Sequence, residues 1–322
     1  MYDSIIVGGG IAGLQAAIQL GRYRRTVVVI DREDGRSTLC RSYHNVLGYP
    51  EGVSGEWLRQ SGRKQAAAYG VQFVAAEAAE AERHKDGIFT VACRKGGRYA
   101  ARSVLLATGV KDRIPEVPGL RPCLGLTVYI CPDCDGYEIR GKRTLVLGSG
   151  NAGAGMALEL MYHKPAGITL INHERIAATP ELEAKLAQAG IETVPGPIEH
   201  IVHNGPEHVG TFAGVRLKDG TAIEAERAFI AFGGNEVRSD LAAKLGVERM
   251  ENKHIATDSR SKMTNVPGVW AAGDVAVHSQ QLTIAMGEGL QAAIWMHKWL
   301  LKQDALTGMC SDSGSGSGNS GS

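Results

Sequence analysis

The residues best suited to chemistry are two cysteines separated by two residues, Cys131 and Cys134, followed directly by Asp135 and Gly136. A Cys-x-x-Cys pair can open and close as a redox disulfide, or it can supply half of a structural zinc site. Such a zinc site needs a second pair of ligands. The other cysteines, at positions 40, 93, 123 and 310, are isolated in the sequence, and no Cys-x-x-His is present. The pattern therefore predicts a redox pair and no bound metal.

A glycine loop near the start of the chain predicts dinucleotide binding. An apolar strand over residues 4–7 runs into Gly8, Gly10 and Gly13 in a GxGxxG pattern. The first glycine allows a tight turn, the second lets the backbone approach a pyrophosphate, and the third lets helix and strand pack closely. Asp31 ends the next strand, where a carboxylate can accept hydrogen bonds from a ribose diol.

The same pattern returns in the second half of the chain. The strand at 144–147 leads into Gly148, Gly150 and Gly153, and a second strand follows at 168–171. Two βαβ dinucleotide folds are therefore expected. The predicted fold class is α/β, with two Rossmann-like three-layer domains, the second inserted into the first. The discontinuous first domain spans 1–114 plus 236–305, and the inserted domain spans 115–235 and carries the Cys-x-x-Cys pair.

The positions of prolines and glycines between the two patterns support these domain boundaries. Prolines at 115, 118 and 122 mark one crossing between the domains, and Gly233-Gly234 marks the return, so both segments are candidate hinges. Residues 282–301 have helical periodicity without proline. Residues 306–322 form a tail dominated by Ser and Gly, which we expect to be disordered, and Cys310 lies within it.

Three separated stretches together resemble the FAD motifs of two-dinucleotide-binding flavoproteins. They are the first glycine loop, Ala107-Thr108-Gly109 after a buried strand, and the late Ala272-Gly273-Asp274 before a long helix. With Cys-x-x-Cys-Asp-Gly between the two domains, and with Arg41–Asn45 running to Gly48-Tyr49-Pro50, the chain resembles the low-molecular-weight thioredoxin reductases. The resemblance covers nearly all of residues 1–305.

The resemblance implies a set of roles. Cys134 would be the thiol beside the flavin C4a, Cys131 the interchange thiol that attacks an external disulfide, and Asp135 the general acid. The implied cofactor is FAD, and the implied protein is a cytoplasmic homodimer that reduces a thioredoxin-like protein or a small disulfide. Besides the first glycine loop and Asp31, the resemblance implies FAD contacts from Asn45, Thr108, Gly109, Gly273, Asp274, Gln281 and Leu282.

The chain departs from the resemblance after its second glycine loop. NADPH-specific relatives place basic residues there for the ribose 2′-phosphate, whereas this chain has Asn172 and Glu174, with Arg175 as the firmly cationic residue. Three interpretations stay open. The donor could be NADH, with Asn172 or Glu174 on the ribose diol. It could be NADPH, weakly bound. Or the domain could have lost this role, as in relatives that take electrons from ferredoxin or that oxidise dithiols with oxygen.

Composition excludes several function classes. The chain has 322 residues, with 35 basic against 34 acidic residues and a net charge of +1. We therefore expect neither nucleic acid nor a membrane surface as a partner. There is no apolar run of about 18 residues, which predicts no transmembrane helix, and no signal peptide is expected. A flavin-binding regulatory protein without turnover is the alternative of another class, and the intact Cys-x-x-Cys-Asp argues against it.

Overall fold

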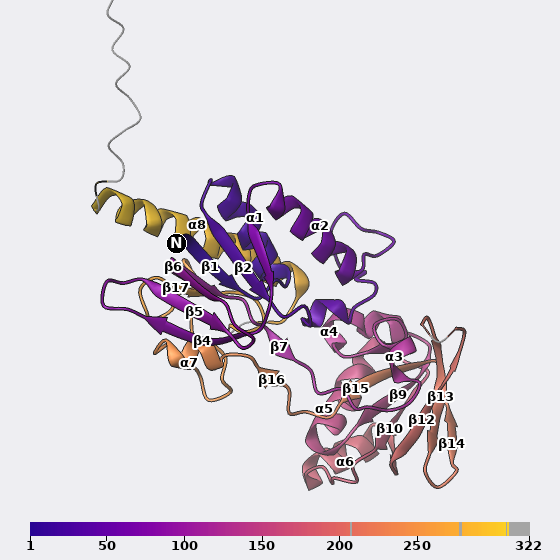
Figure 1. Cartoon of the computed structure of the whole chain (residues 1–322). Coiled ribbons are helices and arrows are strands. Elements are labelled where there is room, and N and C mark those ends of the chain that lie inside the picture. The colour runs from indigo at the N-terminus through magenta and orange to yellow at the C-terminus, as the bar shows by residue number, and fades with distance from the viewer. Residues whose placement is uncertain (207, 277–278, 307, 309–322) are drawn as a thin grey trace, which may run out of the picture. The chain divides into compact units, whose positions relative to one another are not determined.

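A computed structural model describes residues 1–206, 208–276, 279–306 and 308 (Figure 1). The described chain separates into two compact units. Unit 1 comprises Met1–Gly35, Arg59–Gly109 and the described residues from Val237 onward, and unit 2 comprises Arg36–Leu58 and Val110–Glu236. The predicted tail, apart from residues 306 and 308, and Cys310 with it, lie outside the described residues.

Unit 1 is built on a seven-stranded sheet in the order β3-β2-β1-β6-β5-β4, with β17 also paired to β6. The strands β1, β2, β3, β6 and β17 are parallel, whereas β4 and β5 join as an antiparallel ribbon. The strand bounds are β1 Tyr2–Val7, β2 Val27–Asp31, β3 Gln72–Ala75, β4 Ala78–Arg83, β5 Phe89–Cys93, β6 Arg98–Leu106 and β17 Val269–Ala271.

Side chains alternate between the two faces of this sheet, and each face buries a core of its own. Ile6 and Val29 belong to the core that includes residues of α1 and α8, while Ile5 and Ile30 belong to the core that includes residues of α7. This alternation follows from the two-residue period of a strand. The helices of unit 1 are α1 Ile11–Arg22, α2 Gly55–Ala67 (its first residues fall in unit 2), α7 Asp240–Lys244 and α8 Leu282–Leu306.

Unit 2 has a five-stranded parallel sheet in the order β11-β10-β9-β15-β8, and a three-stranded antiparallel sheet, β12-β13-β14. One core includes residues of both sheets and the other includes residues of α5 and α6. The strands are β7 Val110–Lys111, β8 Val128–Tyr129, β9 Arg143–Gly148, β10 Gly167–Asn172, β11 Glu192–Pro195, β12 Ile198–Asn204, β13 Thr211–Leu217, β14 Ala222–Glu224 and β15 Arg227–Ala231; β16, Glu236–Val237, lies at the return crossing.

Unit 2 also contains four α-helices and three single turns of 3-10 helix among its described residues. They are α3 Leu120–Cys123, α4 Pro132–Asp135, α5 Gly150–Leu160 and α6 Pro180–Gln188, with single 3-10 turns at Arg36–Thr38, Gly136–Ile139 and Met161–His163. Each unit therefore holds a strand, a glycine loop and a helix in direct succession, β1 to α1 and β9 to α5. The predicted fold class, two Rossmann-like α/β domains, is confirmed.

One segment groups differently from the sequence-based boundaries. Residues Arg36–Leu58 belong to unit 2, although the sequence placed them in the first domain. The reason is a set of polar contacts made after the chain has folded. The Arg36 guanidinium donates to the Asp112 carboxylate, with Nη2 to Oδ1 at 2.6 Å, and Arg41 donates to the carbonyl oxygens of Pro122 and His208. No local pattern in residues 36–58 predicts these contacts with distant residues.

Candidate active site and cofactor loops

In the glycine loop of unit 1, the first and third glycines are packed against backbone, whereas the second glycine faces open space. A Cβ at Gly8 would lie 2.2 Å from the Ala107 carbonyl oxygen, and a Cβ at Gly13 would lie 1.9 Å from the Gly8 carbonyl oxygen. Neither position can hold a side chain without moving backbone. By contrast, a Cβ at Gly10 would meet no described atom within 4 Å. Because α1 begins at the next residue, its first amide groups lie beside that open space.

Asp31 lies beside this loop and is held by two arginines. Its buried carboxylate accepts hydrogen bonds through Oδ2 from Arg59 Nη2 at 2.8 Å and from Arg63 Nη2 at 3.2 Å. A Cβ at Gly9 would lie 2.7 Å from the same oxygen, so the carboxylate contacts the glycine loop. Sequence reasoning missed both arginines. Their four-residue spacing on the helix places them on one face and was the available signal.

The late Gly-Asp motif reaches the same edge of unit 1. The Ala272 amide donates to the Leu106 carbonyl oxygen at 3.1 Å, which extends the pairing of β17 with β6. Gly273 has φ +79° and a Cβ there would lie 2.9 Å from the Ala12 Cβ in the first turn of α1. Its amide donates to the buried Glu288 carboxylate at 3.0 Å. The first and third FAD motifs therefore lie against each other.

Two further predicted positions complete that edge. Gly109 follows β6 with φ +65°, and the Thr108 hydroxyl donates to the Arg238 carbonyl oxygen. The helix α8 begins at Leu282, where the Gln281 carbonyl accepts the Ala285 amide at 2.9 Å. The strands β1, β2, β6 and β17 are parallel, so all these residues follow their carboxyl ends, where α/β sheets bind ligands. Asn45 lies in the segment that groups with unit 2, and its role stays a prediction.

These residues of unit 1 fit the ADP half of FAD. The open space above Gly10 admits a pyrophosphate, the amides at the start of α1 can donate to it, and Arg59 and Arg63 fix the Asp31 carboxylate beside it. A lone glycine turn would need none of these features. The fit supports the predicted FAD contacts without testing each one.

The redox pair of unit 2 is a disulfide between Cys131 and Cys134, with Cα atoms 5.3 Å apart. Pro132 starts the short helix α4 directly after Cys131. The Cys134 amide donates to the Cys131 Sγ at 3.1 Å, and the Asp135 amide donates to the Cys131 carbonyl oxygen at 3.1 Å. An amide that points at Sγ stabilises a thiolate there once the disulfide opens.

Asp135 has the environment of a proton donor. Burial, with a smaller contribution from the nearby Glu138 carboxylate, raises the pKa of the Asp135 carboxyl to about 7. A group with that pKa can both give and take a proton near neutral pH. Burial and the Asp135 carboxylate also raise the pKa of the Cys40 thiol to about 12, which keeps Cys40 protonated. Cys40 is therefore a neighbour of this site without the thiolate character of a redox cysteine.

The second glycine loop is closed at its first glycine, as the first loop is, but its second glycine has a different backbone conformation. A Cβ at Gly148 would lie 2.3 Å from the Ala231 carbonyl oxygen, and Gly150 has φ +54°. Asn172 ends β10, and its side-chain amide donates to the Ile176 carbonyl oxygen at 2.9 Å. The Glu174 carboxylate forms an ion pair with Arg113, a residue that sequence reasoning missed. The candidate nucleotide residues of unit 2 thus lie together, and the acid is already neutralised by a neighbour.

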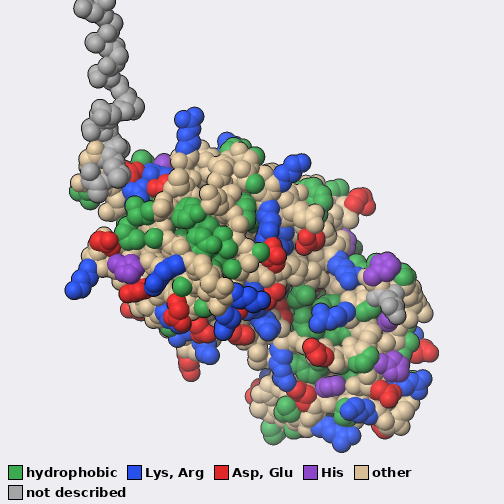
Figure 2. Space-filling view, in the orientation of Figure 1, with side chains coloured by type: hydrophobic (Ala, Val, Ile, Leu, Met, Phe, Trp, Pro, Cys, Tyr) green, Lys and Arg blue, Asp and Glu red, His purple; other side chains and the backbone are tan. Residues whose placement is uncertain are grey.

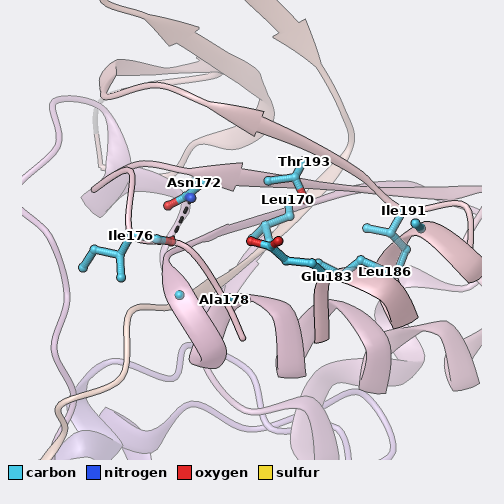
Figure 3. A pocket seen from close by; sticks show the side chains of 10 residues that line it. Leu170, Asn172, Ile176, Ala178, Glu183, Leu186, Ile191 and Thr193 are labelled. Carbon is cyan, nitrogen blue, oxygen red and sulfur yellow. Dashed lines mark hydrogen bonds between the residues drawn. The ribbon is translucent and has the colours of Figure 1, made fainter. Parts of the chain in front are cut away.

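A cavity of about 240 Å³ opens beside this loop (Figure 3). Asn172 and Ile176, joined by their hydrogen bond, line one part of it, and side chains of α6 line another. The lining is apolar apart from a few polar side chains. The residues concerned are Gly150, Leu170, Asn172, Ile176, Ala178, Glu183, Leu186, Ala187, Ile191 and Thr193.

The described surface carries charges of both signs. On the face drawn in Figure 2, basic and acidic side chains are interspersed over the described residues. Within the described part of the chain, no helix is long and apolar enough to cross a membrane. The same residues contain no group of three or more His, Cys, Asp or Glu side chains that could hold a metal ion.

Comparison with known proteins agrees with this arrangement. Residues 2–289 match the family model described as pyridine nucleotide-disulphide oxidoreductase. The thioredoxin reductase sirT of Leptosphaeria maculans is 30% identical over 305 residues, which cover 91% of this chain and 92% of sirT. A subunit of the alkyl hydroperoxide reductase from Pseudomonas putida is 31% identical over 94% of this chain, but the match covers 59% of that longer protein.

A solved structure gives the same result. The crystal structure of thioredoxin reductase from Streptococcus pyogenes superposes with a TM-score of 0.81 at 25% identity, covering 94% of this chain and 99% of that one. The family supports the use of a flavin and of NAD(P)H. The chain belongs to the pyridine nucleotide-disulphide oxidoreductases and, within them, to the low-molecular-weight thioredoxin reductase-like enzymes.

Proposed function

We propose that this oxidoreductase binds FAD and exchanges electrons with a thioredoxin-like protein or a small disulfide through Cys131 and Cys134. The observation that carries the proposal is the Cys131–Cys134 disulfide on α4, next to a carboxyl group whose pKa is raised to about 7. A homodimer located in the cytoplasm, which the resemblance implies, is part of the proposal.

The reduced pair would react by ordinary thiol–disulfide exchange. The Cys131 thiolate attacks one sulfur of the partner's disulfide, which forms a mixed disulfide and releases the partner's other sulfur as a thiolate. The Cys134 thiolate then attacks Cys131, which closes the Cys131–Cys134 disulfide and releases the partner's second thiolate. The partner gains two electrons and the enzyme pair loses two. The Cys134 amide near the Cys131 Sγ supports the choice of Cys131 as the first nucleophile.

Asp135 would supply a proton to a leaving thiolate. Its raised pKa leaves much of the carboxyl protonated near neutral pH, and it directly follows Cys134 in the chain. FAD, when bound along the open edge of unit 1, supplies a carrier that takes or gives two electrons. The residues expected to hold it are the first glycine loop, Asp31, Thr108, Gly109, Gly273, Asp274 and the start of α8.

In a second candidate function, electrons flow in the opposite direction or come from a different donor. The electrons could enter from a dithiol and leave to oxygen, or they could arrive from ferredoxin. One observation favours this candidate. The position where NADPH-specific relatives carry basic residues holds Glu174, and the nearby Arg113 is paired with it. The redox pair acts in the same way under either candidate.

The test isolates the cysteines from the question of the donor. Holoenzyme reduced with dithionite is mixed with a chromogenic aromatic disulfide, and thiol release is followed by stopped flow. Cys131→Ser should slow the release by at least about a thousandfold, because it removes the first nucleophile. Cys134→Ser should release the first thiol and then stop at the mixed disulfide, because it removes the sulfur that releases the second thiol.

The matched control is Cys93→Ala, which removes a cysteine from the core of unit 1. It should keep the rate of thiol release within about threefold, since core substitutions of this kind act on stability. All three variants should retain bound FAD. A wild-type rate in Cys131→Ser, or release of the second thiol by Cys134→Ser, would refute the proposal.

A further inference from the structure

Residues 173–179, here named the strap, cross the second glycine loop and bond to four of its consecutive residues. The Gly148 carbonyl oxygen accepts the His173 amide at 3.0 Å. The Ser149 Oγ accepts the Glu174 amide at 2.9 Å. The Gly150 amide donates to the Ile176 carbonyl oxygen at 3.1 Å. The Asn151 Oδ1 accepts the Thr179 amide at 2.8 Å. The strap therefore forms hydrogen bonds with the loop along the whole of its turn.

The contact at Gly150 bears directly on phosphate binding. In a dinucleotide fold the second glycine lets a pyrophosphate approach the backbone, whose amides then donate to it. Here the Gly150 amide already has the Ile176 carbonyl oxygen as its acceptor. A Cβ at Gly150 would lie 3.2 Å from the Ile176 Cγ2, so the Ile176 side chain covers the space that the missing Cβ leaves. A phosphate and this isoleucine cannot share that space.

Two side chains that precede Ile176 hold the strap. The Glu174 carboxylate pairs with Arg113, whose guanidinium also lies 5.9 Å from the centroid of the Phe232 ring. The Asn172 side-chain amide donates to the same Ile176 carbonyl oxygen that receives the Gly150 amide. An anion approaching the Gly150 amide would meet this carbonyl oxygen.

The space left beside the strap is small. The cavity lined by Gly150, Asn172 and Ile176 has a volume of about 240 Å³ (Figure 3). Ile176 of the strap and Gly150 of the loop both line it, so the strap forms part of its wall where the backbone of the loop lies.

We propose that the strap is a gate over the dinucleotide site of unit 2, and that Ile176 is the residue that sets how far NADH or NADPH is excluded. A nucleotide then binds only to molecules whose strap is displaced, and its apparent affinity falls by the fraction that is open. This inference rests on the proposed function only in treating unit 2 as the nicotinamide-type domain.

The test compares Ile176→Gly with Val209→Gly in the holoenzyme. Ile176 and Val209 are similarly exposed, at 53% and 50%, and both lie in unit 2, but Val209 is outside the strap. Binding of NADH and of NADPH is measured by calorimetric titration. Ile176→Gly should bind at least one of them at least about tenfold more tightly than the wild type, whereas Val209→Gly should match the wild type.

A second measurement reports on the strap without any nucleotide. Hydrogen exchange of the Gly150 amide should be slow in the wild type and in Val209→Gly, because the strap accepts that hydrogen bond, and faster in Ile176→Gly. Faster exchange without a gain in affinity would overturn the gate. Unchanged exchange would overturn the assignment to Ile176, and low-micromolar binding of either nucleotide by the wild type would overturn exclusion.

The proposed function is tested separately on the same variants. Thiol release from dithionite-reduced holoenzyme involves no nucleotide, so Ile176→Gly should leave its rate within about threefold of the wild type. A loss of thiol release from the wild type itself would count against the redox pair and leave the gate standing.

Discussion

The two glycine loops share one motif and differ in what lies over it. In unit 1 the space above Gly10 is free of described atoms to 4 Å, whereas in unit 2 the Ile176 Cγ2 would lie 3.2 Å from a Cβ at Gly150. Both loops turn from a parallel strand into a helix, but their backbones differ at the second glycine. Gly10 has φ −76° and precedes α1, whereas Gly150 has φ +54° and begins α5. The motif alone therefore predicts the turn, and the residues after the second strand decide whether a phosphate can reach it.

The equivalent residues at the ends of the second strands show the same contrast. In unit 1 this residue is Asp31, whose carboxylate is held by Arg59 and Arg63. In unit 2 it is Asn172, whose amide holds the strap in place. Each loop has compensated ion pairs beside it, since Asp31 and Glu33 offset Arg59 and Arg63, and Arg113 offsets Glu174. Access is what differs between the loops, and it favours a dinucleotide at the first.

The largest expected effect comes from the third glycine of each loop. A Cβ at Gly13 would lie 1.9 Å from the Gly8 carbonyl oxygen, which is backbone, whereas a Cβ at Gly153 would lie 3.0 Å from the end of the Leu170 side chain. We expect Gly13→Ala to lose bound FAD almost completely, because the strand and the helix must separate. The flavin-to-protein absorbance ratio after gel filtration measures this.

Gly153→Ala is the matched variant in the second loop. A leucine methyl can turn away, so we expect a stability loss of about 1 kcal/mol and full FAD content. Thermal unfolding measures the stability of both variants. If Gly153→Ala lost FAD as Gly13→Ala does, the two loops would not be separate in function, and the contrast between them would fail.

The next largest effect concerns Asp135, the proposed general acid beside the cysteine pair of unit 2. With an alkyl disulfide, whose basic leaving thiolate takes up a proton, Asp135→Asn should slow the reduction by about a hundredfold at neutral pH, the lower end of what general acids contribute. In the wild type the rate should fall as pH rises through about 7, since the protonated carboxyl is the donor and its pKa lies there. The variant should lack that inflection. A stopped-flow pH profile with the same inflection in both proteins would remove Asp135 from the mechanism.

Stability gives an independent check on the same carboxyl. Its pKa is raised from 3.8 to about 7 on folding, so the folded protein holds a proton that the unfolded chain releases between those values. Stability should therefore be highest below about pH 4 for this group, fall as pH rises, and level off above about 7. Asp135→Asn should remove this contribution, which urea titrations at several pH values would reveal.

Most of the fold was predictable from local patterns. The strands that precede both glycine loops, the second strands after them, and the helix from Leu282 all follow from apolar periodicity and glycine spacing, which act within a few residues. The family resemblance rested on the order of these motifs and is confirmed. The roles of the individual cofactor residues stay predictions, because no observation tests each contact.

What the sequence could not predict depends on residues distant in the chain. Arg59 reaches Asp31 across 28 positions, and Arg113 reaches Glu174 across 61. The strap was interpreted from its residue types alone, as a poor phosphate site, because its bonds to residues 149–151 exist only after β9 and β10 pair. The raised pKa of Asp135 likewise needs the burial that tertiary structure provides.

The smallest effect concerns the choice between NADPH and NADH at the second loop. The Glu174 carboxylate offsets the charge of Arg113, which leaves that arginine unable to favour a 2′-phosphate. We therefore expect the wild type to bind NADPH no more tightly than NADH. In the Ile176→Gly background, where the strap no longer excludes the nucleotide, Glu174→Gln should favour NADPH over NADH by about two- to fivefold, because it removes the carboxylate that offsets the charge of Arg113.

The shift should be small because the Arg113 side chain is 49% exposed, and water screens exposed charges to within about 1 kcal/mol. For the same reason, the preference should shrink as salt rises from about 0.05 to 0.5 M, since the screening length falls below the spacing of the charges. Calorimetric titration of both nucleotides at the two salt concentrations measures it. A preference for NADPH of more than tenfold in the wild type would show that another cation, such as Arg175, binds the 2′-phosphate and that the second loop is not depleted of positive charge.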